Sequence, residues 1–133
     1  MKYLLDTHTF IWSFRQPESL SKKVYDIISD SDNKIYLSSI SLWEIAIKHQ
    51  IKKLDLGNLN ILHIPNIASE YDYTIVNPEP YDYITFSELP VKENHRDPFD
   101  RMLIHTAIRN NFIILSKDEK FAQYEKDGLQ LLW

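Results

Sequence analysis

Short, almost continuously apolar segments alternate along this chain with longer segments whose apolar residues recur at helical spacing. The clearest short segments are residues 2–5, 34–37 and 112–115, and each is followed directly by Asp or Ser. Strands that are apolar on both faces are typical of parallel sheets, in which the intervening helices form the crossovers. The pattern therefore predicts an α/β fold with helices on both faces of a parallel sheet.

The remaining elements rest on weaker signals. We expect two further strands, over 74–76 and 129–133, and helices near Phe10, from Ser21, over 40–51, over 81–89, from Asp97 and around Phe121. The middle of the chain, from 55 to 77, fits one or two short helices, with Pro65 expected as a break. A length of 133 residues suits a single domain spanning 1–133.

Composition excludes several classes of function. The chain has no cysteine, which rules out disulfides, zinc–thiolate sites and thiol nucleophiles, and its two glycines disfavour a glycine-rich phosphate cradle. No apolar run reaches the roughly 20 residues of a membrane span, and an acid as early as position 6 does not suit a signal peptide. We therefore expect a cytoplasmic protein without a membrane partner.

The net charge of −4 argues against a protein that coats nucleic acid through a global positive potential. It does not exclude a nuclease. Bound divalent cations would cancel much of a local acidic cluster, and patches of Lys and Arg still hold a phosphate backbone.

Four carboxylates lie at the edges of apolar segments: Asp6, Glu44, Asp100 and Asp118. An acid at such a position is costly to desolvate unless a positive group lies beside it. In open parallel sheets, functional groups gather beyond the carboxyl ends of the strands. Four such acids, from the beginning, middle and end of one small domain, suggest a shared cation.

Each acid also has a purely structural interpretation, and these alternatives stay open. Asp6 and Asp118 are suited to cap the helices that follow them, although Thr7 and Thr9 are available to cap in place of Asp6. Glu44 borders the apolar face of its helix, where a Glu44–Lys48 pair would be favourable.

The segment that begins at Asp97 has the strongest structural interpretation. Asp97 is a good helix cap, Pro98 suits the first helical position, and Asp100 complements the helix dipole at the third. The two acids nevertheless share one side of the first turn, from which both can approach one metal centre.

Taken as a set, these acids are hard oxygen ligands that suit Mg²⁺ or Mn²⁺. Such ions activate water and stabilise in-line displacement at a phosphodiester, so no side chain has to act as nucleophile. The histidines lack a common metal-ligand spacing, and we expect them to lie on the surface or to support the ligands; they are His8, His49, His63, His95 and His105.

Several segments of the chain resemble the motifs of a known family. These segments are similar to successive motifs of the PIN-domain ribonucleases, and most closely to the VapC-type toxins of bacterial toxin–antitoxin modules. The resemblance runs from Met1 to about Phe121 and is carried by LLDTHTFIW, SSISLWEIAIKHQIKKL, LPVKENHRDPFDRMLIHTA and ILSKDEKF.

The resemblance implies specific roles. The acidic quartet of the family falls on the four acids named above, with Asp97 as an additional acid near the metals. Thr7 and Ser116 resemble small hydroxyl positions that flank the site, whereas His8 departs from the commoner Asn or Ser at its position. Candidate contacts to the RNA backbone are Arg15, Lys48, Lys52, Arg96 and Arg101, for which solvated surface charge is the alternative.

The resemblance further implies a three-layer α/β/α fold, Mg²⁺- or Mn²⁺-dependent endoribonuclease activity on cellular RNA, a homodimer and a cognate antitoxin partner. The alternatives are a PIN-like nuclease that is not a toxin and a non-catalytic partner-binding module. An aspartyl phosphatase would need a second Asp where His8 stands. A receiver domain would need an acceptor Asp after a central strand, and Asp55 follows none.

Overall fold

A five-stranded parallel sheet forms the centre of the protein, in a computed structural model that describes residues 1–133. Its strand order is β3-β2-β1-β4-β5, with every neighbouring pair parallel. The strands are β1 (Lys2–Leu5), β2 (Lys34–Ser38), β3 (Thr74–Val76), β4 (Ile113–Leu115) and β5 (Gln130–Leu132). The predicted parallel sheet is confirmed.

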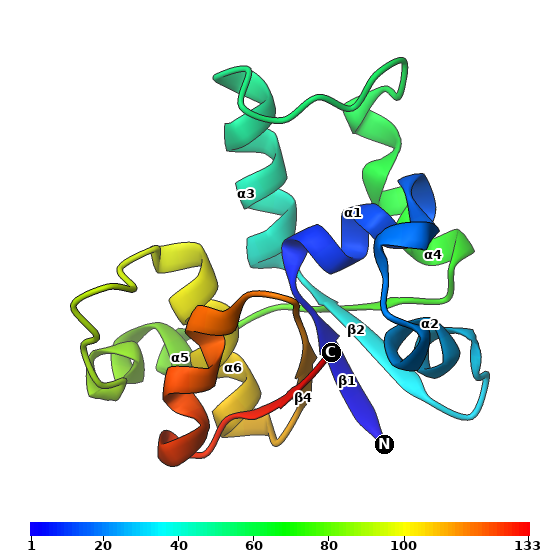
Figure 1. Ribbon diagram of the computed structural model, residues 1–133. Helices are drawn as coiled ribbons and strands as arrows, with labels where there is room; N and C mark the ends of the chain where they lie inside the picture. The colour runs from blue at the N-terminus through cyan, green and yellow to red at the C-terminus, as the bar shows by residue number, and fades with distance from the viewer.

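Six α-helices and four short 3-10 helices connect these strands (Figure 1). The α-helices are α1 (Thr7–Arg15), α2 (Lys22–Ser29), α3 (Ser39–Gln50), α4 (Ile64–Glu70), α5 (Pro80–Thr85) and α6 (Pro98–Asn110). The 3-10 helices are η1 (Pro17–Ser19), η2 (Ile61–His63), η3 (Phe86–Glu88) and η4 (Glu119–Asp127). None of the helices is long and apolar enough to cross a membrane.

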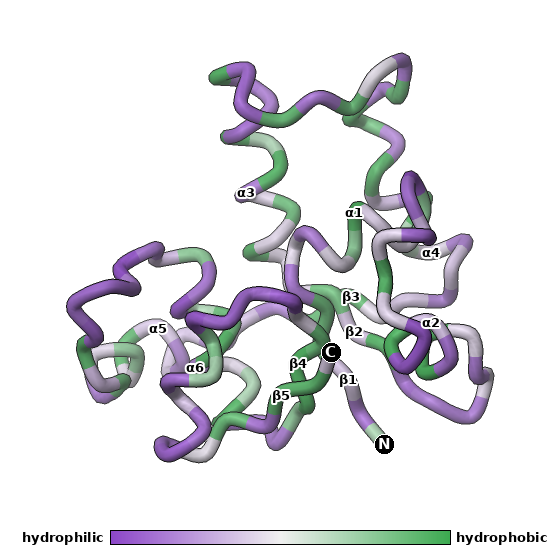
Figure 2. The backbone as a smooth tube through the Cα atoms, viewed as in Figure 1, coloured by the Kyte–Doolittle hydropathy of each residue, from purple (hydrophilic) through white to green (hydrophobic).

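The sheet separates two apolar cores. Leu5 and Leu115 face a core that α1, α2 and α4 close, whereas Leu4 and Ile114 face a second core closed by α6 and η4. Figure 2 shows the hydrophobic segments along the strands and the hydrophilic ones on the outer loops. Side chains that alternate between two buried faces require helices on both sides, and the α/β/α fold of three layers is confirmed.

Two local predictions need correction. The first helix begins at Thr7 instead of near Phe10, because the side chain of Asp6 itself accepts from the Thr7 N–H and caps it. Two short helices do meet near Pro65, since η2 ends at His63 and α4 begins at Ile64, but Pro65 lies in the first turn of the second helix instead of between the two. Its missing N–H is not needed there.

Because the strands are parallel, the residues that follow β1, β2 and β4 lie at the same edge of the sheet. Asp6 follows β1, Ser116 follows β4, and the Asp6 N–H donates to the Leu115 carbonyl across the two strands at 3.2 Å. Ser38, at the end of β2, caps α3 by accepting from the Ile40 N–H. The carboxyl ends of β1, β2 and β4 therefore meet where the sequence predicts a site.

Candidate active site

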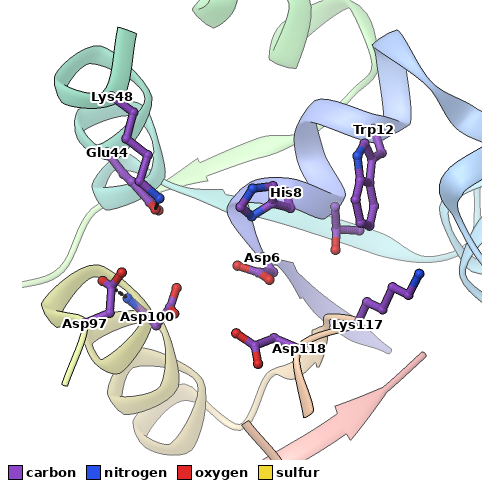
Figure 3. Close-up of a pocket in the computed structure, with 10 residues that line it drawn as sticks. Asp6, His8, Trp12, Glu44, Lys48, Asp97, Asp100, Lys117 and Asp118 are labelled. Carbon is purple, nitrogen blue, oxygen red and sulfur yellow. Dashed lines mark hydrogen bonds and ion pairs between the residues drawn. The ribbon is translucent and has the colours of Figure 1, made fainter. Parts of the chain in front are cut away.

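A polar pocket of about 550 Å³ opens at this edge of the sheet (Figure 3). Its walls come from α1, α3, α6 and the segment after β4, so residues from most of the chain converge on it. All five acids that the sequence singled out line it, and the full lining is Asp6, His8, Thr9, Trp12, Glu44, Lys48, Asp97, Asp100, Lys117 and Asp118.

Three of these acids form the tightest group. One carboxylate oxygen from each of Glu44, Asp97 and Asp100 lies within 4.8 Å of the other two. Figure 3 shows this group on one side of the pocket, with Asp6 and Asp118 opposite it. The structure thus brings together the α3 acid and both acids of the α6 first turn, while the two acids that follow strands form a second wall.

Glu44 is almost fully buried, at 2% exposure, and is held by two partners. One oxygen accepts from the Thr7 hydroxyl at 2.7 Å, and the other pairs with the Lys48 ammonium one turn later. Although burial lowers it, the nearby carboxylates of Glu44, Asp97 and Asp100 raise the pKa of Lys48 above its usual value. The Glu44–Lys48 pair and the position in the pocket therefore coexist.

Asp6 has both oxygens engaged. Oδ1 accepts from the Thr7 N–H and Oδ2 from the Ser116 hydroxyl, each at 2.7 Å. Burial raises the pKa of Asp6 to about 6, even though the hydrogen bond from Ser116 and the charge of His8 favour the ionised form. Thr7 and Ser116 thus orient two different acids of the site.

Asp97 and Asp118 cap helices and also face the pocket. Oδ1 of Asp97 accepts from the N–H groups of Phe99 and Asp100, and Oδ1 of Asp118 accepts from that of Lys120. In both residues the hydrogen bonds use one oxygen, so the cap fixes the carboxylate while the other oxygen stays available. The structural and functional interpretations of these acids are compatible.

Asp100 lies in the most unfavourable environment for a negative charge. Burial, reinforced by the charges of Asp6, Asp97, Glu44 and Asp118, raises the pKa of Asp100 to about 8. His95 lies behind it, with Nε2 at 3.3 Å from Oδ2 and Nδ1 hydrogen-bonded to the Tyr124 hydroxyl at 2.9 Å. Burial lowers the pKa of His95, so His95 does not supply a positive charge that would favour the ionised form of Asp100 at neutral pH.

The predicted RNA-contacting cations are distributed differently. Of the five predicted cations, only Lys48 lines the pocket. Arg15 donates to the Leu56 carbonyl, and Arg101 donates to the Leu89 carbonyl at 3.1 Å, so both hold loop backbone. Lys52 and Arg96 are exposed outside the lining.

The histidines need one correction. His8, His49 and His63 are exposed and His95 supports Asp100, as expected, but His105 is buried and hydrogen-bonded to Thr85 away from the pocket. Its place on the α6 face toward α5 is a consequence of tertiary packing.

Sequence reasoning missed part of the lining. It did not select Trp12 or Lys117, although Trp12 lies one turn after His8 on α1 and Lys117 directly precedes Asp118. The position of Trp12 one helical turn after His8, and of Lys117 next to Asp118, could have indicated these residues. The first relation is informative only when α1 is known to border the pocket.

A sheet of this strand order with acids gathered beyond its carboxyl edge defines an α/β protein with a carboxylate-lined pocket. The model of the PIN domain matches residues 3–127. The chain therefore belongs to the PIN domain family. A comparison with curated protein sequences finds no significant match.

Solved structures share this fold at low sequence identity. VapBC2 from Rickettsia felis, bound to a DNA fragment from its promoter, is similar at a TM-score of 0.69 and 18% identity, over 99% of this chain and 98% of that one. DNA-bound VapBC from Salmonella typhimurium gives 0.67 and 14%, over 99% and 97%. VapBC-1 from nontypeable Haemophilus influenzae gives 0.66 and 17%, over 99% and 97%.

Proposed function

We propose that this protein is a metal-dependent endoribonuclease that hydrolyses phosphodiester bonds of cellular RNA. The observation that carries the proposal is the convergence of five carboxylates from four separate segments on one open pocket. Membership of the PIN domain family supports it. Repulsion among these carboxylates destabilises the folded protein unless a cation offsets it.

The donor set suits Mg²⁺ or Mn²⁺, because every ligand candidate is a carboxylate oxygen. Glu44, Asp97 and Asp100 would hold the ion, with Asp6 and Asp118 on the facing wall. When bound, it supplies an activated water and charge stabilisation for in-line displacement at phosphorus.

The surrounding side chains position these acids. Thr7 and Lys48 each bind one oxygen of Glu44 and so fix the orientation of its carboxylate, and Ser116 orients Asp6. Lys48 is also placed to contact a phosphate at the pocket, and the exposed Lys52 and Arg96 extend the positive charge available to the RNA backbone.

We further propose that the protein is the toxin of a type II toxin–antitoxin pair and that a cognate antitoxin inhibits it. We also propose that the toxin is a cytoplasmic homodimer in which residues 1–133 form one domain. The sequence motifs shared with VapC-type toxins support this role. The common fold with three VapBC structures over almost the whole chain is consistent with it.

The test of the enzymatic proposal is cleavage of RNA by the purified protein with Mg²⁺ or Mn²⁺, followed by mapping of the cut sites. Asp6→Asn is expected to abolish cleavage while the fold is retained, because Asn still caps α1 but lacks the charge. The loss should exceed roughly 100-fold, as for removal of a strong electrostatic contribution to a transition state.

Asp26→Asn is the matched control, since Asp26 is exposed on α2 and pairs only with Lys22. It should cleave like the wild type. Cleavage by Asp6→Asn at the wild-type rate would contradict the proposal, and absence of cleavage in every protein would favour a non-catalytic binding module. Growth arrest on induction, relieved by co-expression of a neighbouring antitoxin gene, separates a toxin from another nuclease.

A further inference from the structure

One wall of the acidic pocket is aromatic and basic. It consists of His8, Trp12 and Lys117, and we call it the α1 wall. We propose that the α1 wall binds one unpaired nucleobase of the RNA next to the cleaved bond, by stacking on Trp12, with Lys117 contacting an adjacent phosphate. This proposal rests on the proposed nuclease function and names the form of RNA that enters the pocket.

Trp12 has the features of a stacking platform. It is half-buried, unlike Phe10 on the same helix, which is fully buried in the core. Its ring is fixed between His8 and Trp133, with ring centroids at 6.0 and 5.9 Å. Both neighbours are tilted, at 50° and 58°, so neither stacks face to face on the indole. A planar base can provide that contact.

The distribution of charge favours a nucleotide on this wall. Lys117 is exposed and forms no ion pair in the structure, whereas Lys48 is paired with Glu44. Figure 3 shows Lys117 and Trp12 on the same side of the pocket, away from the group of Glu44. An aromatic face next to an unpaired cation is the combination that proteins use to hold single-stranded nucleic acid.

The size of the pocket agrees with this occupant. A volume of about 550 Å³ falls within the roughly 300–1,000 Å³ of ligand pockets. Stacking on the π-face of Trp12 is available to every base, so we expect tolerance among the four bases at this position. A base inside a duplex is already stacked and paired, so the preferred substrate is a loop or other unpaired segment.

The experiment measures the coupling between Trp12 and the base. Short RNA substrates containing the mapped cut site are prepared intact and with one abasic nucleotide at each flanking position. For the wild type, kcat/KM should fall roughly 10- to 100-fold at one of these positions. Trp12→Leu should show a similar loss on the intact substrate and no further loss on that abasic one, whereas Trp12→Phe should recover most of the activity.

Trp43→Leu is the matched control. Trp43 is 59% exposed in a neighbouring apolar groove, against Phe99, and does not line the acidic pocket. This variant should retain the full abasic penalty. If Trp12→Leu also retains the full penalty, Trp12 serves only packing and the proposal is overturned.

A binding measurement separates this proposal from the nuclease itself. In Trp43→Phe/Trp133→Phe protein, Trp12 is the only tryptophan, and a single-stranded oligonucleotide should quench its fluorescence more than the abasic version does. Quenching without any cleavage would refute the nuclease and leave the base site standing. Cleavage without quenching, or quenching by an antitoxin peptide in place of the oligonucleotide, would refute the base site.

Discussion

At the scale of single residues, Asp100 lowers the free energy of unfolding because of its position in the acidic pocket. Burial and the charges of four neighbouring acids raise the pKa of Asp100 to about 8, so without a cation the folded protein holds a proton that the unfolded chain releases near pH 4. The folded state therefore binds more protons between these pH values, and the free energy of unfolding falls as pH rises through them.

Asp100→Asn should remove this penalty. In EDTA, we expect the variant to be more stable than the wild type at pH 7 by roughly 1–3 kcal/mol, and the difference to shrink toward pH 5. Urea unfolding at several pH values measures this directly. Asp26→Asn should follow the wild-type curve, and an Asp100→Asn advantage that does not grow with pH would contradict the explanation.

At the scale of elements, an ion pair joins α5 to α6. Arg109 Nε donates to Asp82 Oδ1 at 2.7 Å, and Asp82 Oδ2 accepts from the Glu79 N–H at the start of α5. Burial disfavours the charge, but the Glu79 N–H and the Arg109 guanidinium outweigh it and lower the pKa of Asp82. The stability from this carboxylate is present above about pH 4 and is lost as pH falls through its folded pKa.

Arg109→Met should destabilise the protein at pH 7 by roughly 1–3 kcal/mol, because it leaves the buried Asp82 without its cation. Lys22→Met is the matched control, since Lys22–Asp26 has the same 2.7 Å distance but side chains 88% and 58% exposed. Its cost should be much smaller than that of Arg109→Met, because solvent screens an exposed pair. Equal losses in urea unfolding would show that burial does not decide the strength of these pairs.

Elements were predictable from sequence where a local pattern determines them. The apolar runs of β1 and β4 and the Asp97-Pro98 helix start have the predicted positions within a residue. Pro65 misled because the same residue type breaks a helix interior and favours its first turn. Which of these applies depends on where the preceding η2 ends, and no local pattern marks that point.

The sequence indicated the acids of the pocket and three side chains that bind them, Thr7, Lys48 and Ser116. Strand ends and helix starts mark Asp6, Asp97 and Asp118 in sequence, but helix capping explains each of them singly, so only the set of acids indicates a site. The sequence does not indicate that Arg15 and Arg101 hold loop backbone, because their partners are carbonyls of distant loops. Trp12 likewise owes its orientation to Trp133, at the far end of the chain.

At the scale of the whole molecule, the parallel sheet is what makes five repelling carboxylates possible. Asp97 and Asp118 are fixed as helix caps, Asp6 and Glu44 by hydroxyl groups, and Asp100 lies against His95. The strand order β2-β1-β4 brings the elements that carry them to one edge of the sheet. The apolar cores on both faces of the sheet offset the repulsion. The unfolded chain separates the acids, so a cation that bridges them binds the folded state alone.

Mg²⁺ or Mn²⁺ should therefore raise the melting temperature. At a concentration of about 100 times Kd the added free energy of unfolding is about 2.7 kcal/mol, which for a domain of this size corresponds to roughly 5–15 °C. Differential scanning fluorimetry at pH 7.5 measures the shift, with NaCl at equal ionic strength as control and EDTA to reverse it. Asp100→Asn should lose most of the shift and Asp26→Asn none. A shift of equal size in NaCl would mean that screening acts instead of a bound ion.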